Sequence, residues 1–197
     1  MSKKQYALVI DLDRCIGCLG GCRVACKMEH GIALGESRSK MYRMESGRYP
    51  DLEMYFLPVM CQQCENPPCA TFCPTDACYK DPEDGVIKID TSRCVGCGTC
   101  RQSCPYGAMN FNKEMRVMDK CDICSELRAR GEKPACVKNC AGSAIHYGDI
   151  SDPESDVSKL LRDAGENVYS LPDKGNKPSG RFILRGAKWK EEEPWRT

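Results

Sequence analysis

Apolar residues in this chain occur in short runs separated by polar segments rich in Gly and Pro, so the sequence predicts many small elements. Residues 6–10 have the length and composition of a buried strand. Residues 52–57 and 181–184 form two more candidate strands. Residues 86–89 alternate in polarity after a turn of Asp, Pro and Gly, which predicts a β-hairpin arm over 74–90.

One segment has the pattern of an amphipathic helix. Asp152 is a candidate N-cap and is followed by Pro at the first helical position. Val157, Leu160 and Leu161 form an apolar stripe, and Gly165 is placed to end the helix. The rest of the chain is a Pro-, Gly- and Lys-rich segment, for which we expect an extended arm.

The cysteines change this picture, because sixteen of the seventeen fall into four groups of four. The groups are Cys15, Cys18, Cys22, Cys26; Cys61, Cys64, Cys69, Cys73; Cys94, Cys97, Cys100, Cys104; and Cys121, Cys124, Cys136, Cys140. The third group is followed by Pro105 and matches the bacterial ferredoxin run C-x2-C-x2-C-x3-C-P. In that run three cysteines bind one [4Fe–4S] cube and the last binds its neighbour. The sequence therefore predicts four [4Fe–4S] clusters.

Two other uses of cysteine are less consistent with the spacing. Disulfides need separated partners, whereas the recurring C-x2-C pairs could close only local loops. Tetrahedral zinc uses two C-x2-C-like pairs, and only the last group could pass for such a site.

Composition and charge are consistent with a protein interior that iron–sulfur clusters fill in part. Ile, Leu, Val and Phe make up 33 of 197 residues, which is below the roughly 20 % at which an ordinary core becomes doubtful. The net charge of +1 argues against disorder. Four cubes of about −2 each would give the loaded protein a net charge of roughly −7, so we expect no nucleic-acid partner.

The prolines suggest how the groups pair. Pro74 and Pro105 follow the second and third groups, whereas the first and last groups lack this proline. We therefore expect an α+β, loop-rich fold of two nested ferredoxin-like units. The first unit comprises 1–57, with an insertion at 31–57, together with 113–150; the second comprises 58–112; and 151–197 form a C-terminal helix and partner-wrapping arm.

Nesting predicts four ligand sets, because each pair of groups exchanges its last cysteine. The sets are Cys15, Cys18, Cys22 and Cys140 for cluster 1; Cys26, Cys121, Cys124 and Cys136 for cluster 2; Cys61, Cys64, Cys69 and Cys104 for cluster 3; and Cys73, Cys94, Cys97 and Cys100 for cluster 4. A serial arrangement, with the first group paired to the second and the third to the fourth, remains an alternative.

Residues 5–150 resemble the four-cluster electron-transfer subunit of molybdopterin oxidoreductases, such as dimethyl sulfoxide, polysulfide and thiosulfate reductases. The resemblance rests on the segments ALVIDLDRCIGC, CQQCENPPC, CPTDA, CVGCGTCRQSCPYGA and HYGD. One departure is the first group, whose second gap has three residues and contains Gly20 and Gly21. Glycines bend such a loop without steric cost, so ligation by Cys22 is still expected.

The resemblance implies an electron-transfer subunit that is not an enzyme on its own. It implies a large molybdopterin (Mo or W) catalytic partner and an external or membrane redox partner, with electrons passing through clusters 1, 2, 3 and 4 in that order from the catalytic side. A subunit of a nickel–iron hydrogenase or hydrogenlyase complex and a soluble polyferredoxin are the alternatives.

Few residues outside the framework could carry chemistry. We expect His30 and His146 to be structural or solvated, and Cys78 to be a small buried apolar side chain without a basic neighbour. The sequence has no apolar run long enough to span a membrane and no N-terminal signal. We therefore expect a cytoplasmic location, or export and membrane association through a partner.

Overall fold

The computed structural model describes residues 4–191 and 193–194. Its largest sheet has four strands, in the order β8 (Ile145–Asp149), β1 (Tyr6–Asp11), β10 (Arg181–Ile183) and β9 (Val168–Tyr169). Strand β1 lies at the centre, antiparallel to β8 and parallel to β10. The predicted strands at 6–10 and 181–184 are confirmed to within one residue.

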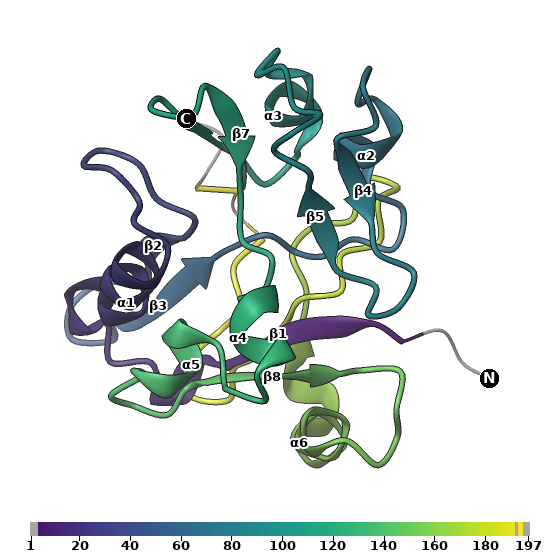
Figure 1. The fold of residues 1–197 in the computed structure, drawn as a ribbon. Helices are drawn as coiled ribbons and strands as arrows, with labels where there is room; N and C mark the ends of the chain where they lie inside the picture. Colours follow the sequence, from purple (N-terminus) through teal and green to yellow (C-terminus); the bar gives the residue numbers. More distant parts are fainter. Residues whose placement is uncertain (1–3, 192, 195–197) are drawn as a thin grey trace.

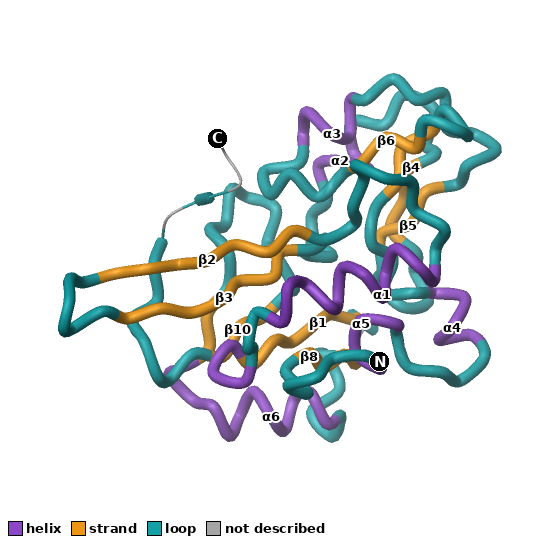
Figure 2. Tube along the Cα trace, turned by 90° about the vertical axis from the view of Figure 1, so that its left-hand side faces the viewer, coloured by secondary structure: helices purple, strands orange, loops and turns teal. Residues whose placement is uncertain are grey.

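Three hairpins surround this sheet. They are β2–β3 (Lys40–Ser46, Glu53–Val59), β4–β5 (Cys78–Lys80, Ile87–Ile89) and β6–β7 (Asn110–Asn112, Val117–Asp119). The hairpin arm predicted over 74–90 and the strand predicted at 52–57 are therefore confirmed. Figure 2 shows that β2–β3 projects from the body of the protein.

The helices are short. They are α1 (Gly21–Glu29), α2 (Pro68–Thr71), α3 (Thr99–Ser103), α4 (Ser125–Ala129), α5 (Ala135–Lys138) and α6 (Asp156–Ala164), with 3-10 turns η1 (Leu12–Arg14), η2 (Cys18–Gly20) and η3 (Gly165–Asn167). Helix α1 packs on α5, and α2 packs on α3. Figure 1 shows α2 and α3 at the top of the molecule, apart from α1 and α5 at the lower left. No helix within the described ranges is long and apolar enough to cross a bilayer.

Helix α6 begins later than the sequence predicted. Its N-cap is Ser155, whose hydroxyl accepts a hydrogen bond from the Ser158 backbone N–H at 3.2 Å. Asp152 instead caps a preceding turn, where it accepts from the Glu154 N–H at 2.8 Å. The Ser155 hydroxyl also donates to the Asp149 carbonyl at the end of β8, and this tertiary bond fixes the helix start. The predicted apolar stripe and the terminal glycine are confirmed.

The C-terminal arm is built into the fold rather than lying free. Strand β10 pairs with the central strand, and Phe182 is buried. Beyond it, Trp189 stacks on Tyr169 with ring centroids 5.0 Å apart and lies 6.2 Å from the ring of Tyr55. Residues 168–189 therefore complete the protein's own core, and the predicted wrapping of a partner remains a prediction.

The main core contains many of the framework cysteines. Leu57, Ile87 and Phe182 are almost completely buried there, in the same cluster as the thiols of Cys61 and Cys121. Cysteine side chains therefore fill space in this core that Leu or Ile would occupy in an ordinary domain.

Candidate iron–sulfur sites

The third cysteine of each group has the same place in the structure, the second residue of a short helix. These residues are Cys22 in α1, Cys69 in α2, Cys100 in α3 and Cys136 in α5. Backbone N–H groups in a first helical turn have no intrahelical acceptor, so they can face the negative charge of a thiolate ligand. The sequence thus repeats one local geometry four times, including in the first group.

The enlarged gap of the first group is accommodated by glycine. Gly20 has φ +77°, a left-handed conformation that closes η2 and starts α1 at the next residue. A Cβ on Gly21 would lie 3.2 Å from the Cys18 sulfur. The loop keeps Cys22 buried, as expected for a ligand.

Two cavities are lined by complete predicted ligand sets. Cys73, Cys94, Cys97 and Cys100 line one cavity together with Cys78. Cys26, Cys121, Cys124 and Cys136 line the other, together with Cys22. In each case one cysteine comes from a different group, so these cavities bring together the first group with the fourth, and the second with the third.

In the other two predicted sets, some of the cysteines lie close enough for their charges to interact. Burial raises the pKa of Cys15, and the neighbouring thiols of Cys140 and Cys18 raise it further. Burial likewise raises the pKa of Cys61 to about 11, with contributions from Cys69 and Cys104 that Lys120 partly offsets. Cys140 therefore lies beside the first group.

Charge interactions between thiols also indicate which cysteines of different predicted sets lie near each other. Burial raises the pKa of Cys136, to which Cys22 contributes. The same applies to Cys121, to which Cys61 contributes. Burial raises the pKa of Cys100 to about 11, and Cys69 is the largest contributor among the thiols. The members of three cysteine pairs, Cys22 and Cys136, Cys61 and Cys121, and Cys69 and Cys100, therefore lie near each other.

The geometry differs from that of a zinc site. Within residues 4–191 and 193–194, no three His, Cys, Asp or Glu side chains converge closely enough to bind a single metal ion. A tetrahedral zinc ion requires such convergence, whereas a cube takes each thiolate on a different iron atom.

Several hydrogen bonds reach framework sulfurs. Asn176 Nδ2 lies 3.0 Å from Cys64 Sγ, and His30 Nε2 lies 3.2 Å from Cys124 Sγ. The Ala144 backbone N–H donates to Cys140 Sγ at 3.2 Å. Such bonds are one of the means by which a protein sets cluster potentials. Asn176 is 112 residues from Cys64, and no motif in the sequence pointed to it.

The start of the insertion at 31–57 also reaches a ligand set. Arg38 lines the cavity of Cys26 and Cys121. Its guanidinium binds both carboxylate oxygens of Asp119, at 2.7 and 2.8 Å, and lies 3.4 Å from Asp122. This charge is therefore paired beside the cavity.

The remaining candidate residues have structural surroundings. His146 lies on β8 opposite Val9 and is half-buried. Cys78 is buried, as predicted, and its backbone N–H donates to Cys73 Sγ at 3.4 Å. The expectation that Cys78 has no basic neighbour is wrong, because Lys120 is close enough for the two charges to interact. That neighbour is remote in sequence, so spacing could not reveal it.

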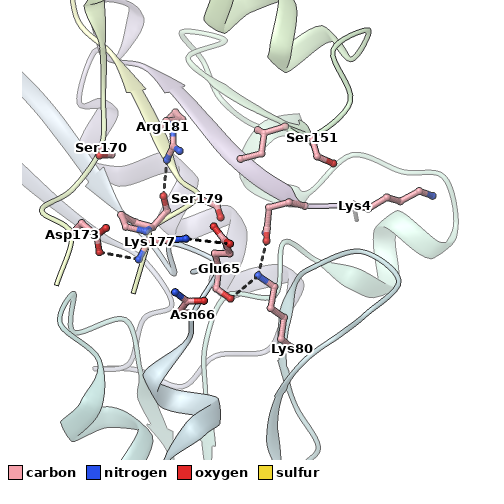
Figure 3. Close-up of a pocket in the computed structure, with 13 residues that line it drawn as sticks. Lys4, Glu65, Asn66, Lys80, Ser151, Ser170, Asp173, Lys177, Ser179 and Arg181 are labelled. Atoms are coloured by element: carbon pink, nitrogen blue, oxygen red, sulfur yellow. Dashed lines mark hydrogen bonds and ion pairs between the residues drawn. The ribbon is translucent and has the colours of Figure 1, made fainter. Parts of the chain in front are cut away.

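A wide polar hollow lies between residues 65–66 and the C-terminal arm (Figure 3). Several polar side chains that line it bind one another: Lys80 Nζ donates to Gln5 Oε1 at 2.7 Å, and Lys177 lies 3.5 Å from Glu65. The Lys177 backbone N–H donates to Asp173 at 2.9 Å. The Lys177–Glu65 pair therefore attaches the C-terminal arm to the rest of the fold at this hollow. These paired side chains do not form a nucleophile–base arrangement.

Comparison with known proteins agrees with this geometry. Residues 52–150 match the family described as the 4Fe-4S dicluster domain. The sequence is 36 % identical to the B subunit of sulfite dehydrogenase from Allochromatium vinosum, over 92 % of this protein and 83 % of that one. It is 38 % identical to the B subunit of tetrathionate reductase from Salmonella typhimurium (89 % and 71 %) and 39 % identical to the B subunit of polysulfide reductase from Wolinella succinogenes (80 % and 83 %).

The cysteine arrangement and these relatives lead to one conclusion. This protein belongs to the [4Fe–4S] dicluster family, among the iron–sulfur B subunits of oxidoreductases.

Proposed function

We propose that this chain relays single electrons through four [4Fe–4S] clusters, between a large molybdopterin (Mo or W) catalytic subunit and an external or membrane redox partner. When bound, each cluster accepts and releases one electron. The observation that carries the proposal is the one loop–helix geometry that is repeated in all four cysteine groups, with the third cysteine of each group as the second residue of a short helix. The relatives named as B subunits of sulfur-compound oxidoreductases support the catalytic partner.

The ligand sets we propose are the nested ones. Clusters 2 and 4 are supported by the two cavities that their cysteines line. Cluster 1 is supported by the proximity of Cys140 to Cys15, and cluster 3 by that of Cys104 to Cys61. A serial pairing would require the first group to exchange with the second, and the neighbouring thiols give that arrangement no support.

The proposed electron path runs through clusters 1, 2, 3 and 4. The charge interactions of Cys22 with Cys136, of Cys61 with Cys121 and of Cys69 with Cys100 support this order, because each links one proposed set to the next. The exposed framework cysteines also support it. Among the cysteines, Cys18 and Cys97 are exposed, and they belong to the first and last clusters of the proposed path.

Each end of the path has exposed apolar side chains that could bind a partner. Ile16 and Val95 occupy equivalent positions beside Cys18 and Cys97, and they are 64 % and 67 % exposed. At the first end, Phe56 of β3 packs over Gly17. The projecting β2–β3 hairpin is thus rooted beside cluster 1, and its turn exposes Tyr49. The family resemblance implies that this end faces the catalytic subunit.

The partner assignment can be tested by isolating the complex. The chain would be affinity-tagged in its native host and purified under anaerobic conditions, followed by analysis of bound metals and pterin. We expect a large co-purifying chain with molybdenum or tungsten and a pterin. A nickel-containing partner would point to a hydrogenase-type complex, and the absence of any redox partner would point to a free polyferredoxin.

A structure of the complex tests the direction of the path. The proposal requires the cluster of Cys15 to lie nearer than that of Cys94 to the redox centre of the catalytic subunit. The reverse order would overturn it. The same complex would also indicate where the protein is found in the cell, because we propose that its partner determines any export or membrane association.

A further inference from the structure

Lys120 is a buried lysine at the junction of the two proposed units. It follows β7 directly and precedes Cys121, and the whole residue is 3 % exposed. Its Nζ donates to the carbonyl of Ile87 on β5 and to the carbonyl of Cys121, the latter at 2.9 Å. The ammonium is thus held between the β4–β5 hairpin of one unit and the last cysteine group of the other.

The hydrogen bonds of Lys120 place its ammonium beside two cysteine groups. The Cys121 carbonyl that it binds also accepts from Gln63, which lies between Cys61 and Cys64, and Gln63 in turn accepts from the Ile87 N–H. The thiols close enough for their charge to interact with the ammonium are those of Cys61, Cys121, Cys69 and Cys78. Three of them are proposed ligands: Cys121 of cluster 2, and Cys61 and Cys69 of cluster 3.

No carboxylate within the described part of the chain forms an ion pair with Lys120. The Asp122 carboxylate is close enough to interact with the charge of Lys120. That carboxylate, however, accepts hydrogen bonds from Ser125 and forms an ion pair with Arg38. The nearby Arg38 differs, because it is neutralised by Asp119 as well as Asp122. The positive charge of Lys120 is therefore not offset by an ion pair with a described carboxylate, and it remains available to thiolates that bind a cluster.

A buried ammonium without a carboxylate partner is unfavourable unless other negative charge compensates it. A cube with four thiolates carries about −2, and one added electron makes this about −3. A fixed positive charge close to two cubes stabilises the added electron on each of them, and a low local dielectric strengthens the effect.

We propose that Lys120 is a positioning residue that offsets the negative charge of clusters 2 and 3 together, and so holds their midpoint potentials above the values they would otherwise have. This inference rests on the proposed ligand sets. The proposal places one positive side chain at the point where an electron passes from the first unit to the second.

The test is a redox titration of the purified holoprotein followed by EPR. Lys120→Gln and Lys120→Met remove the charge, and Lys120→Arg keeps it. Lys88→Met is the matched control, because the Lys88 ammonium binds Asp81 and Asp84 rather than thiols. We expect both neutral variants to shift two of the four potentials to more negative values. The Arg variant and the Lys88 control should stay close to the wild type.

The inference is overturned if the Gln variant retains all its iron and its four potentials match the wild type, or if Lys120→Arg shifts them as far as Lys120→Gln does. If the neutral variants instead lose iron, the loss must fall on clusters 2 and 3 and be prevented by Arg; iron loss elsewhere, or from the Arg variant too, also overturns it. The wild-type titration separates the two claims, because a wild type without four clusters refutes the proposed function itself.

Discussion

The side-chain amide of Asn176 donates a hydrogen bond to the sulfur of Cys64, with Nδ2 and Sγ 3.0 Å apart. The same Nδ2 lies 2.9 Å from the hydroxyl of Tyr106. Asn176 is buried and comes from the C-terminal arm. The arm therefore contributes directly to the surroundings of the second cysteine group.

Replacing Asn176 with Ala should lower the potential of one cluster, that of Cys61, Cys64, Cys69 and Cys104. A hydrogen bond to sulfur favours the reduced cube, and its loss removes this preference. The free energy of unfolding should fall by about 1–3 kcal/mol, because Tyr106 loses a buried partner. Redox titration with EPR measures the potential. Asn167→Ala is the control, since Asn167 donates a comparable bond to Ala164; an equal shift there would contradict the prediction.

Replacing Cys140 with Ala should damage the cluster of Cys15, Cys18 and Cys22, because Cys140 lies beside that group. The clusters of the second unit should keep their spectra. Iron analysis and EPR give the result. Cys78→Ala is the matched control, because Cys78 is buried but outside the framework, and it should retain all its iron. A loss confined to the Cys61 or Cys94 cluster would show that the nested assignment is wrong.

Gly142→Ala should destabilise the same region through the backbone. A Cβ at this position would lie 2.2 Å from the Arg14 carbonyl oxygen, so the loops of the first and fourth groups would have to separate. Overpacking of this kind costs about 1–3 kcal/mol, and we expect faster loss of cluster 1 in air. The rate is followed by absorbance. Ala141→Ser adds an atom at the exposed neighbouring residue and should have little effect; equal rates for the two variants would contradict the clash.

Removal of iron with a chelator should unfold the protein. Cysteine thiols from all four groups are part of the main core, where they lie among the buried aliphatic side chains. Ligation therefore provides folding free energy, as it does in other metal-dependent domains. Near-ultraviolet circular dichroism should lose its signal as the clusters are removed. An apoprotein with a native-like spectrum would show that the core is sufficient by itself.

Local patterns predicted much of the fold. The central strand, the β4–β5 hairpin and the glycine that ends α6 each depend on a few adjacent residues, and all were confirmed. The start of α6 was wrong, because a hydrogen bond from Ser155 to Asp149 outweighed the N-cap signal at Asp152. Strand β9 and the pairing of β1 with β10 depend on contacts across most of the chain, which no local pattern encodes.

The residues of the candidate site also differ in whether local sequence could predict them. Cysteine spacing is a local property, and it predicted the groups and the cluster type that the family match supports. The groups that surround the thiols are remote in sequence. Asn176 and Lys120 reach their sulfur neighbours only through the tertiary fold. Their residue types are common, so a single sequence gave no reason to select them.

The most direct test of the account is the iron content of the anaerobically purified chain. Iron and acid-labile sulfide analysis, with a Mössbauer spectrum, should give about sixteen irons per chain, all in four-iron cubes and none in a three-iron centre. About eight irons, or zinc in place of iron, would contradict the claim that this chain carries four [4Fe–4S] clusters.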